Sequence, residues 1–195
     1  MKLELKIVDL LARNLEKKFT INNVAKLLKE HYSFVHRIVN KLFEDGVIYK
    51  DKVGKSYICS LNLENEKTLI LLQLSEIEKK DYFLSSNKEL KLILDDFVKL
   101  AESQINLISM VLFGSYAKDT ATKESDIDIF MVSKGKAGID KISREIYAKY
   151  GKEINTIIIT PDDFRKQRNK DLIKEIINNH YIIYGVERFV DLVFR

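Results

Sequence analysis

Apolar residues in the first third of the chain recur at spacings of three and four. This period places them on one face of a helix. It predicts a helix over residues 2–17, a second helix capped by Thr20, and a third helix over residues 31–45. Gly46 stands where the third helix needs a left-handed C-cap. Residues 47–62 change to short runs interrupted by a glycine, which predicts a β-hairpin.

The rest of the chain alternates between helical patterns and short apolar runs. Residues 63–84 predict a connecting helix, and a loop-like Ser85-Ser86-Asn87 follows, where Ser86 can cap the next helix. The order of the later elements is typical of a mixed α/β domain with a small sheet. These elements are a helix over 87–103, a strand over 105–113, a short helix over 114–119, a strand over 126–133, a helix over 138–150, a strand over 154–160, and further helices.

We therefore expect an α+β chain in three parts. The first part is residues 1–62, with three helices and a hairpin. Residues 63–86 form a connector helix, and residues 87–195 form the mixed α/β domain. A mixed-charge amphipathic connector could also pack against a second copy of itself and form a homodimer.

Three helices followed by a basic hairpin resemble the winged helix-turn-helix family over residues 3–62. The resemblance implies that the third helix reads base edges of double-stranded DNA in the major groove, while lysines of the wing contact phosphates. The implied DNA-binding residues are Ser33, His36, Arg37, Asn40, Lys41, Lys52 and Lys55. The alternative is that these side chains form a solvated helix face, and that the module serves protein contacts or dimerisation.

The distribution of charge supports an anionic partner for the first part. The whole chain carries a net charge of +4. Residues 1–62 contain 12 Lys and Arg against 7 Asp and Glu, whereas residues 63–195 contain 21 against 22. Positive charge is therefore concentrated in the N-terminal third.

Composition excludes several classes of protein. A hydrophobic fraction of 46% with 32% charged residues is typical of a folded chain and not of a disordered one. No apolar run approaches the roughly 20 residues of a membrane span, and no signal-peptide core is present, so we expect a cytoplasmic protein without membrane contact. One cysteine, Cys59, excludes an internal disulfide and a thiolate zinc cluster, and is expected to be a small buried hydrophobe.

Residues 114–130 combine a small-residue turn, a polar loop and two carboxylates on alternate positions. At Gly114 the missing Cβ lets backbone amides approach a phosphate at the start of a helix, and Ser115 adds a hydroxyl donor. Asp126 and Asp128 alternate with apolar residues, so both should project from one face of a strand. Paired carboxylates can hold divalent cations between protein and triphosphate. The stretch therefore predicts a site for in-line phosphoryl transfer.

The segments G-S-x-A and S-D-x-D, separated by seven residues, resemble the fingerprint of the polymerase-β-like nucleotidyltransferases, and of their minimal branch in particular. The resemblance covers residues 88–192, including the closing YIIYG segment. It implies Mg²⁺ or Mn²⁺ as the metal and ATP or another NTP as the donor. Lys118 and Asp119 replace the frequent Arg-Gly of the loop, and Asp tolerates a left-handed turn. The implied residues are Asp126 and Asp128 for catalysis and metal binding, and Gly114, Ser115, Lys118 and Ser125 for the nucleotide.

Active members of this family usually carry a third carboxylate on the following strand, which completes the metal site and can act as the base. The corresponding position here is Asn155, which is neutral and cannot act as a base. Glu153 stands two residues earlier on the same strand face, about 7 Å along the strand. It could be the third catalytic acid if the strand register is shifted, or it could be an exposed edge residue.

Two functions follow from these features. The first is a metal-dependent nucleotidyltransferase with a DNA-binding winged helix, which transfers AMP from ATP to a hydroxyl acceptor. The second is a weakly catalytic or non-catalytic transcriptional regulator or antitoxin, which senses a nucleotide or binds a partner through the transferase-like domain. The resemblance implies that this partner could be a small helical toxin protein, and Asn155 motivates the second function.

Overall fold

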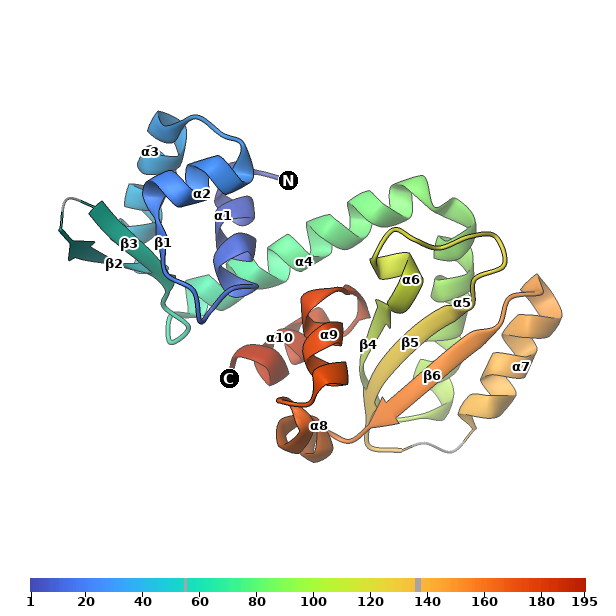
Figure 1. Ribbon diagram of the computed structural model, residues 1–195. Coiled ribbons are helices and arrows are strands. Elements are labelled where there is room, and N and C mark those ends of the chain that lie inside the picture. Colours follow the sequence, from blue (N-terminus) through green and yellow to red (C-terminus); the bar gives the residue numbers. More distant parts are fainter. Residues whose placement is uncertain (55, 136–137) are drawn as a thin grey trace. The chain divides into compact units, whose positions relative to one another are not determined.

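The computed structural model describes residues 1–54, 56–135 and 138–195 (Figure 1). The chain divides into two compact units. Unit 1 is Met1–Glu78 with Phe194–Arg195, and unit 2 is Lys79–Val193. Helix α4 begins in the first unit and ends in the second. Each unit is described by itself below.

Unit 1 combines helices with a small antiparallel sheet whose strand order is β1-β3-β2. The three predicted helices and the hairpin are present, although the first helix is shorter than expected. The two-residue strand β1 was not predicted, and it pairs with β3. The elements are α1 (Leu3–Ala12), β1 (Phe19–Thr20), α2 (Ile21–Leu28), α3 (Tyr32–Glu44), β2 (Ile48–Val53), β3 (Ser56–Leu61) and the start of α4 (Glu66–Ser86).

Local sequence determines where these helices begin and end. Thr20 caps α2, because its side chain accepts a hydrogen bond from the Asn23 N–H and the Asn23 side chain accepts one from the Thr20 N–H. Gly46 follows α3 with a φ of +71°, the left-handed conformation that was expected there. Cys59 is fully buried, as predicted, and burial raises its pKa to about 11.

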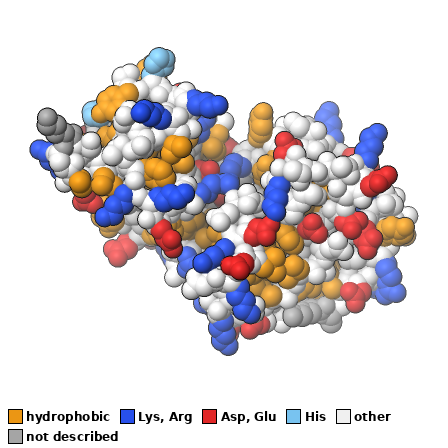
Figure 2. All heavy atoms as spheres, in the orientation of Figure 1, with side chains coloured by type: hydrophobic (Ala, Val, Ile, Leu, Met, Phe, Trp, Pro, Cys, Tyr) orange, Lys and Arg blue, Asp and Glu red, His pale blue; other side chains and the backbone are white. Residues whose placement is uncertain are grey.

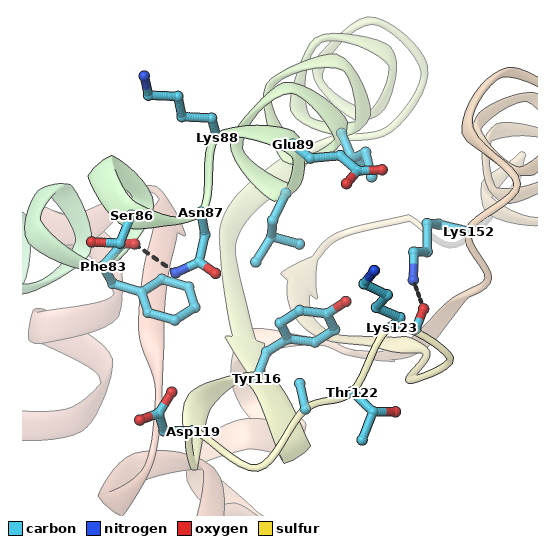
Figure 3. A pocket seen from close by; sticks show the side chains of 13 residues that line it. Phe83, Ser86, Asn87, Lys88, Glu89, Tyr116, Asp119, Thr122, Lys123 and Lys152 are labelled. Carbon is cyan, nitrogen blue, oxygen red and sulfur yellow. Dashed lines mark hydrogen bonds between the residues drawn. The ribbon is translucent and has the colours of Figure 1, made fainter.

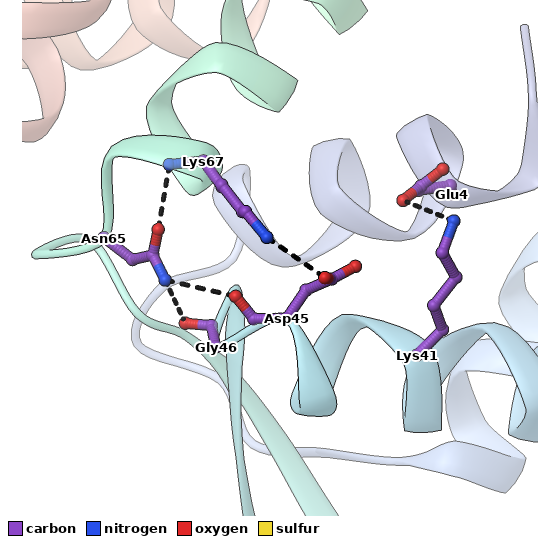
Figure 4. A network of polar contacts seen from close by, with 6 residues as sticks. All are labelled: Glu4, Lys41, Asp45, Gly46, Asn65 and Lys67. Carbon is purple, nitrogen blue, oxygen red and sulfur yellow. Dashed lines mark hydrogen bonds and ion pairs between the residues drawn. The ribbon is translucent and has the colours of Figure 1, made fainter.

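A polar network joins the end of α3 to the start of α4 (Figure 4). Asn65 donates from Nδ2 to the carbonyl oxygens of Asp45 and Gly46 at 3.3 and 3.0 Å. Lys67 donates from its backbone N–H to Oδ1 of Asn65 and places its ammonium 3.1 Å from the Asp45 carboxylate. The turn after α3 is thereby fixed by side chains that lie about 20 residues further along the chain.

Unit 2 is a mixed α/β structure, as predicted, with a sheet of order β6-β5-β4-β7. Strands β5 and β6 are parallel, while β4 pairs antiparallel with both β5 and β7. The elements are α5 (Lys88–Gln104), β4 (Leu107–Phe113), α6 (Gly114–Ala117), β5 (Ile127–Ser133), α7 (Ile139–Tyr150), β6 (Ile154–Ile159), α8 (Pro161–Gln167), α9 (Asp171–Asn178), β7 (Tyr181–Tyr184) and α10 (Val186–Phe194).

Strand alternation divides the core of unit 2 between the two faces of the sheet. Ile127, Ile129 and Met131 join the cluster that contains the buried positions of α5 and α7. Phe130 points to the other face, where it contacts Phe164 of α8. Figure 1 shows α5 and α7 on one side of the strands and α8, α9 and α10 on the other.

Several boundaries differ from the sequence expectation. Helix α6 is a single turn that ends at Ala117, because Asp119 turns left-handed with a φ of +57°. Ser86 is the last residue of α4 and does not cap α5, whose N-cap Asn87 donates instead to the Phe83 carbonyl oxygen. The segment Tyr181–Tyr184 is an edge strand. Among the described residues, no helix has both the length and the apolar character needed to cross a membrane.

Candidate functional site

The two carboxylates and the glycine turn meet where β4 ends and β5 begins. Phe113 pairs in register with Asp128, so the turn that follows β4 lies against the Asp128 side chain. Gly114 has a φ of +69°, and a Cβ placed there would lie 2.0 Å from Oδ2 of Asp128. Glycine is therefore required at this position for two reasons. It adopts the left-handed backbone conformation, and it leaves room for the close approach of the carboxylate.

Asp126 and Asp128 lie on the same face of the sheet, at the start of β5. Asp126 is exposed just before the strand begins, and Asp128 is half-buried as its second residue. Ile127 and Ile129 are fully buried on the opposite face. The buried isoleucines thus fix the direction in which both carboxylates project.

The neighbouring strand β6 supplies an amide at this site. Asn155 pairs in register with Asp128, and its Nδ2 donates a hydrogen bond to Oδ2 of Asp126 at 3.3 Å. Glu153 is exposed and precedes β6, and its carbonyl oxygen accepts from the Ile127 N–H at 2.9 Å. Extended by one residue beyond the Ile127–Ile154 pair, the register places Glu153 beside Asp126, two residues before the Asn155–Asp128 pair. Within the described ranges, no three His, Cys, Asp or Glu side chains gather closely enough to hold a metal ion.

The other residues predicted to bind the nucleotide are Ser125, Lys118 and Ser115, and each has a different environment. Ser125 accepts a hydrogen bond from the Thr122 N–H at 2.9 Å and so closes the loop that precedes β5. Lys118 is half-exposed at the end of α6 and forms an ion pair with Glu175 of α9. Ser115 lies in α6, one residue beyond Gly114. The turn therefore lies against Asp128 and Ser115 follows it directly in the chain. The Lys118 ammonium is instead held by α9, on the other face of the sheet.

A polar pocket of about 670 Å³ lies on the other side of α6 (Figure 3). The side chain of Tyr116 lies in it, and its other walls come from the end of α4, the start of α5 and the loop after α6. Burial, followed by the charges of Glu89 and Asp126, raises the pKa of Tyr116. Sequence reasoning missed this pocket, because Phe83 and Glu89 stand about 30 residues before the turn and meet it only in the fold.

Unit 1 presents most of the predicted DNA-binding residues on α3 and the hairpin. Figure 2 shows lysine and arginine side chains beside exposed apolar ones on the visible face of this unit. His36 and Asn40 are partly buried. Lys55 lies outside the described residues. The exposed residues are Ser33, Arg37, Lys41 and Lys52.

Contacts within unit 1 already engage some of these side chains. Lys50 of β2 donates to Oδ1 of Asn40 at 2.8 Å, and the Asn40 amide contacts Nδ1 of His36 at 3.3 Å. The Lys41 ammonium lies 3.9 Å from Glu4 of α1 (Figure 4). Asn40 therefore connects α3 to the hairpin and is less free than Ser33 to contact a partner.

Comparisons with known proteins identify relatives of this chain. Two relatives from Methanocaldococcus jannaschii carry the names "Putative protein adenylyltransferase MJ1305" and "Putative protein adenylyltransferase MJ0604". The first is 36% identical over 112 residues, which cover 52% of this chain and 76% of the relative. The second is 31% identical over 94 residues, which cover 46% of this chain and 92% of the relative.

A solved structure, "Crystal structure of the toxin-antitoxin with AMP-PNP", superposes with a TM-score of 0.41 at 17% identity, over 51% of this chain and 79% of that chain. That likeness is too weak to support a functional argument. The profile of the family described as "Nucleotidyltransferase domain" matches residues 88–190, and this match spans more than half of the chain. The chain therefore belongs to the nucleotidyltransferase domain family.

Proposed function

We propose that unit 2 is a metal-dependent nucleotidyltransferase that moves AMP from ATP to a hydroxyl acceptor. The observation that carries the proposal is the packing of Gly114 against Asp128, which joins the phosphate-binding turn to the carboxylate pair. In the reaction, the acceptor oxygen bonds to the α-phosphorus and the bond to the bridging oxygen breaks. Pyrophosphate leaves with that electron pair, and the hydroxyl proton passes to solvent.

The donor set of the site fits a hard divalent cation. Mg²⁺ is usually held by one or two carboxylates together with substrate phosphates, and it keeps several waters. Asp126 is exposed and Asp128 is half-buried on the same strand face, so two carboxylates are available and solvent can reach them. A bound Mg²⁺ or Mn²⁺ would supply charge stabilisation at the phosphates. The protein contributes the orientation of both carboxylates and the backbone turn at Gly114.

The names of the relatives support AMP as the transferred group and a protein as the acceptor. A protein hydroxyl is therefore the first acceptor class to test, with ATP as the first donor.

Nucleotide binding and transfer test this proposal directly. ATP labelled in the α-phosphate would be incubated with the protein, Mg²⁺ or Mn²⁺, and candidate acceptor proteins. We expect label transfer that the Asp126→Asn, Asp128→Asn double variant loses by at least about 100-fold, because both metal carboxylates are removed. Wild-type protein that neither binds ATP nor transfers more label than the double variant would refute the proposal.

We also propose that unit 1 is a winged helix that binds double-stranded DNA through α3 and the β2–β3 hairpin. The order of helices and strands, the positive charge of residues 1–62 and the exposed Ser33, Arg37 and Lys52 support it. Binding to duplex DNA should weaken steeply with salt. Each neutralised phosphate contributes about −0.9 to the slope of the logarithm of the binding constant against the logarithm of the salt concentration. The Arg37→Ala variant should bind more weakly, and absence of binding even at low salt would remove this function.

A second candidate function is a regulator or antitoxin that binds nucleotide without efficient transfer. It is favoured by the amide of Asn155, which stands beside Asp128 and donates to Asp126 in place of a third acid. In this case ATP should bind while transfer stays at the level of the double variant. A helical toxin partner and a homodimer formed through α4 remain part of this proposal, and co-purification with light scattering would test both.

A further inference from the structure

The pocket beside α6 has an uneven distribution of charge. Lys123 and Lys152 lie on the side toward which the Tyr116 hydroxyl points, and Asp119 lies at the opposite end (Figure 3). Lys88 and Glu89 at the start of α5 also line the pocket. The Lys152 ammonium is already held by the carbonyl oxygen of Lys123. Within the described ranges, the Lys123 ammonium forms no ion pair. A cation is therefore available next to the tyrosine hydroxyl.

The pocket and the carboxylate site share the short helix α6. Gly114 at its start packs against Asp128, and Tyr116 two residues later lies in the pocket. The charges of Glu89 and Asp126 both act on the Tyr116 hydroxyl and help to raise its pKa. The single turn of α6 therefore links the proposed metal carboxylates to a cavity of about 670 Å³.

We propose that this pocket is the acceptor subsite of the transferase, and that it takes a hydroxyl-bearing polypeptide segment with acidic neighbours. The proposal rests on the transferase function of unit 2. Tyr116 and Glu89 receive the acceptor hydroxyl by hydrogen bonding, and Lys123 pairs with a carboxylate next to it in the acceptor sequence. The volume suits a few side chains of a peptide, since ligand cavities span roughly 300–1,000 Å³.

The lining residues favour a polar segment over an apolar ligand. Amide and hydroxyl groups of Ser86, Asn87 and Thr122 line the pocket together with the charged residues. An apolar ligand would displace water from these groups and from the charged ones without forming hydrogen bonds to them, which costs free energy. A peptide offers backbone donors and acceptors to such walls, and an acidic peptide also complements Lys123.

Peptide binding provides the test, with ATP binding by the wild-type protein measured in parallel. The probes are three labelled twelve-residue peptides, each with one hydroxyl residue flanked by Glu, by Gln or by Lys. We expect the Glu-flanked peptide to bind about tenfold more tightly than the Gln-flanked one, an advantage that salt reduces.

The Lys123→Glu variant should lose this preference and Lys123→Arg should keep it. Lys141→Glu, an exposed change on α7 outside the pocket, should leave it unchanged.

Each outcome decides one of the two proposals. Equal binding of the Glu-flanked and Gln-flanked peptides, or a preference that survives Lys123→Glu, would overturn the acceptor subsite whether or not ATP binds. Wild-type protein that selects the acidic peptide but binds no ATP would refute the transferase and leave the pocket as a peptide-binding site. Selective peptide binding together with ATP binding supports both.

Discussion

Gly114 connects the turn to the carboxylates, and its replacement by alanine should damage both. The variant must place a Cβ in a left-handed residue, which costs about 1–2 kcal/mol, and that Cβ would lie 2.0 Å from Oδ2 of Asp128. We expect Gly114→Ala to lower the unfolding temperature and to weaken ATP binding about tenfold or more, since displacing the carboxylate removes a charge-assisted contact. Calorimetry and thermal unfolding measure the two effects.

Gly151 provides the matched control for this change. It has a φ of +65°, close to that of Gly114, but a Cβ there would meet nothing within 4 Å. Gly151→Ala should therefore cost about the same 1–2 kcal/mol of backbone strain while ATP binds as in the wild type. If both alanine variants bind ATP normally, the close packing of Gly114 on Asp128 has no part in the site.

Asn155 offers a second prediction at the scale of one side chain. Asn155→Asp removes the hydrogen bond to Asp126 and adds a third negative charge. We expect the metal-free variant to be about 1 kcal/mol less stable, because like charges repel and a donor is lost. Mg²⁺ should restore more stability to it than to the wild type, as measured by the shift in unfolding temperature.

The Asn155→Ala variant separates the loss of the hydrogen bond from the effect of the added charge. It removes the same hydrogen bond without adding charge, so it should lose stability and gain no extra response to Mg²⁺. A response of Asn155→Asp equal to that of Asn155→Ala would contradict the placement of residue 155 beside the carboxylate pair.

The residues of the site were partly predictable from the sequence. Gly114, Asp126 and Asp128 were predicted because a turn and a strand of period two are local patterns. The partner of Lys118 was not, since Glu175 stands 57 residues away and only the folded sheet brings it near. The placement of these residues is observed, whereas the roles assigned to Gly114, Ser115, Asp126, Asp128 and Glu153 stay predictions.

At the scale of elements, an exposed network joins α5 to α7. Asp96 of α5 accepts hydrogen bonds at Oδ2 from Lys149 and Tyr150, each at 2.5 Å. The hydrogen bond from Lys149, and after it the one from Tyr150, lowers the pKa of Asp96. The hydrogen bond to Asp96 likewise raises the pKa of Lys149. These contacts cross between the two helices that cover one face of the sheet.

The direction of these shifts predicts a pH dependence for the pair. A lowered carboxyl pKa stabilises the fold above the usual value of about 3.9, and this contribution is lost as pH falls through the lowered pKa. Asp96→Asn should therefore reduce the unfolding temperature at pH 7, and the difference from wild type should vanish in stronger acid. High salt should shrink this difference, because the Lys149 side chain is exposed. Asp95→Asn, at the exposed neighbouring position, is the control that should show no such pH dependence.

Elements with a repeated apolar pattern were predicted, whereas the short strands β1 and β7 were not. Helices α3, α5 and α7 were expected within a few residues of their bounds, because each repeats its apolar period over several turns. The two residues of β1 are too few for any period, and they form a strand only because β3 offers backbone partners. Strand β7 was not predicted, since its pairing with β4 is a long-range event.

The whole molecule consists of two compact units, and matched helix caps test whether they are independent. Thr20 caps α2 of unit 1 by accepting from the Asn23 N–H at 3.2 Å. Thr160 caps α8 of unit 2 by accepting from the Asp163 N–H at 3.1 Å. Replacing either threonine by alanine should cost about 1 kcal/mol of local stability, and independent units should confine that loss to the unit that holds the cap.

Native-state hydrogen exchange can follow both units in one experiment. Thr20→Ala should speed exchange of the amides of α2, α3 and the hairpin while those of β4 and β5 exchange as in the wild type, and Thr160→Ala should do the reverse. ATP binding by unit 2 should then survive Thr20→Ala, since the carboxylates and the Gly114 turn lie wholly within Lys79–Val193. Equal acceleration in both units by either variant would show that the chain unfolds as one cooperative body, and the transferase and DNA-binding functions could not be assigned to separate units.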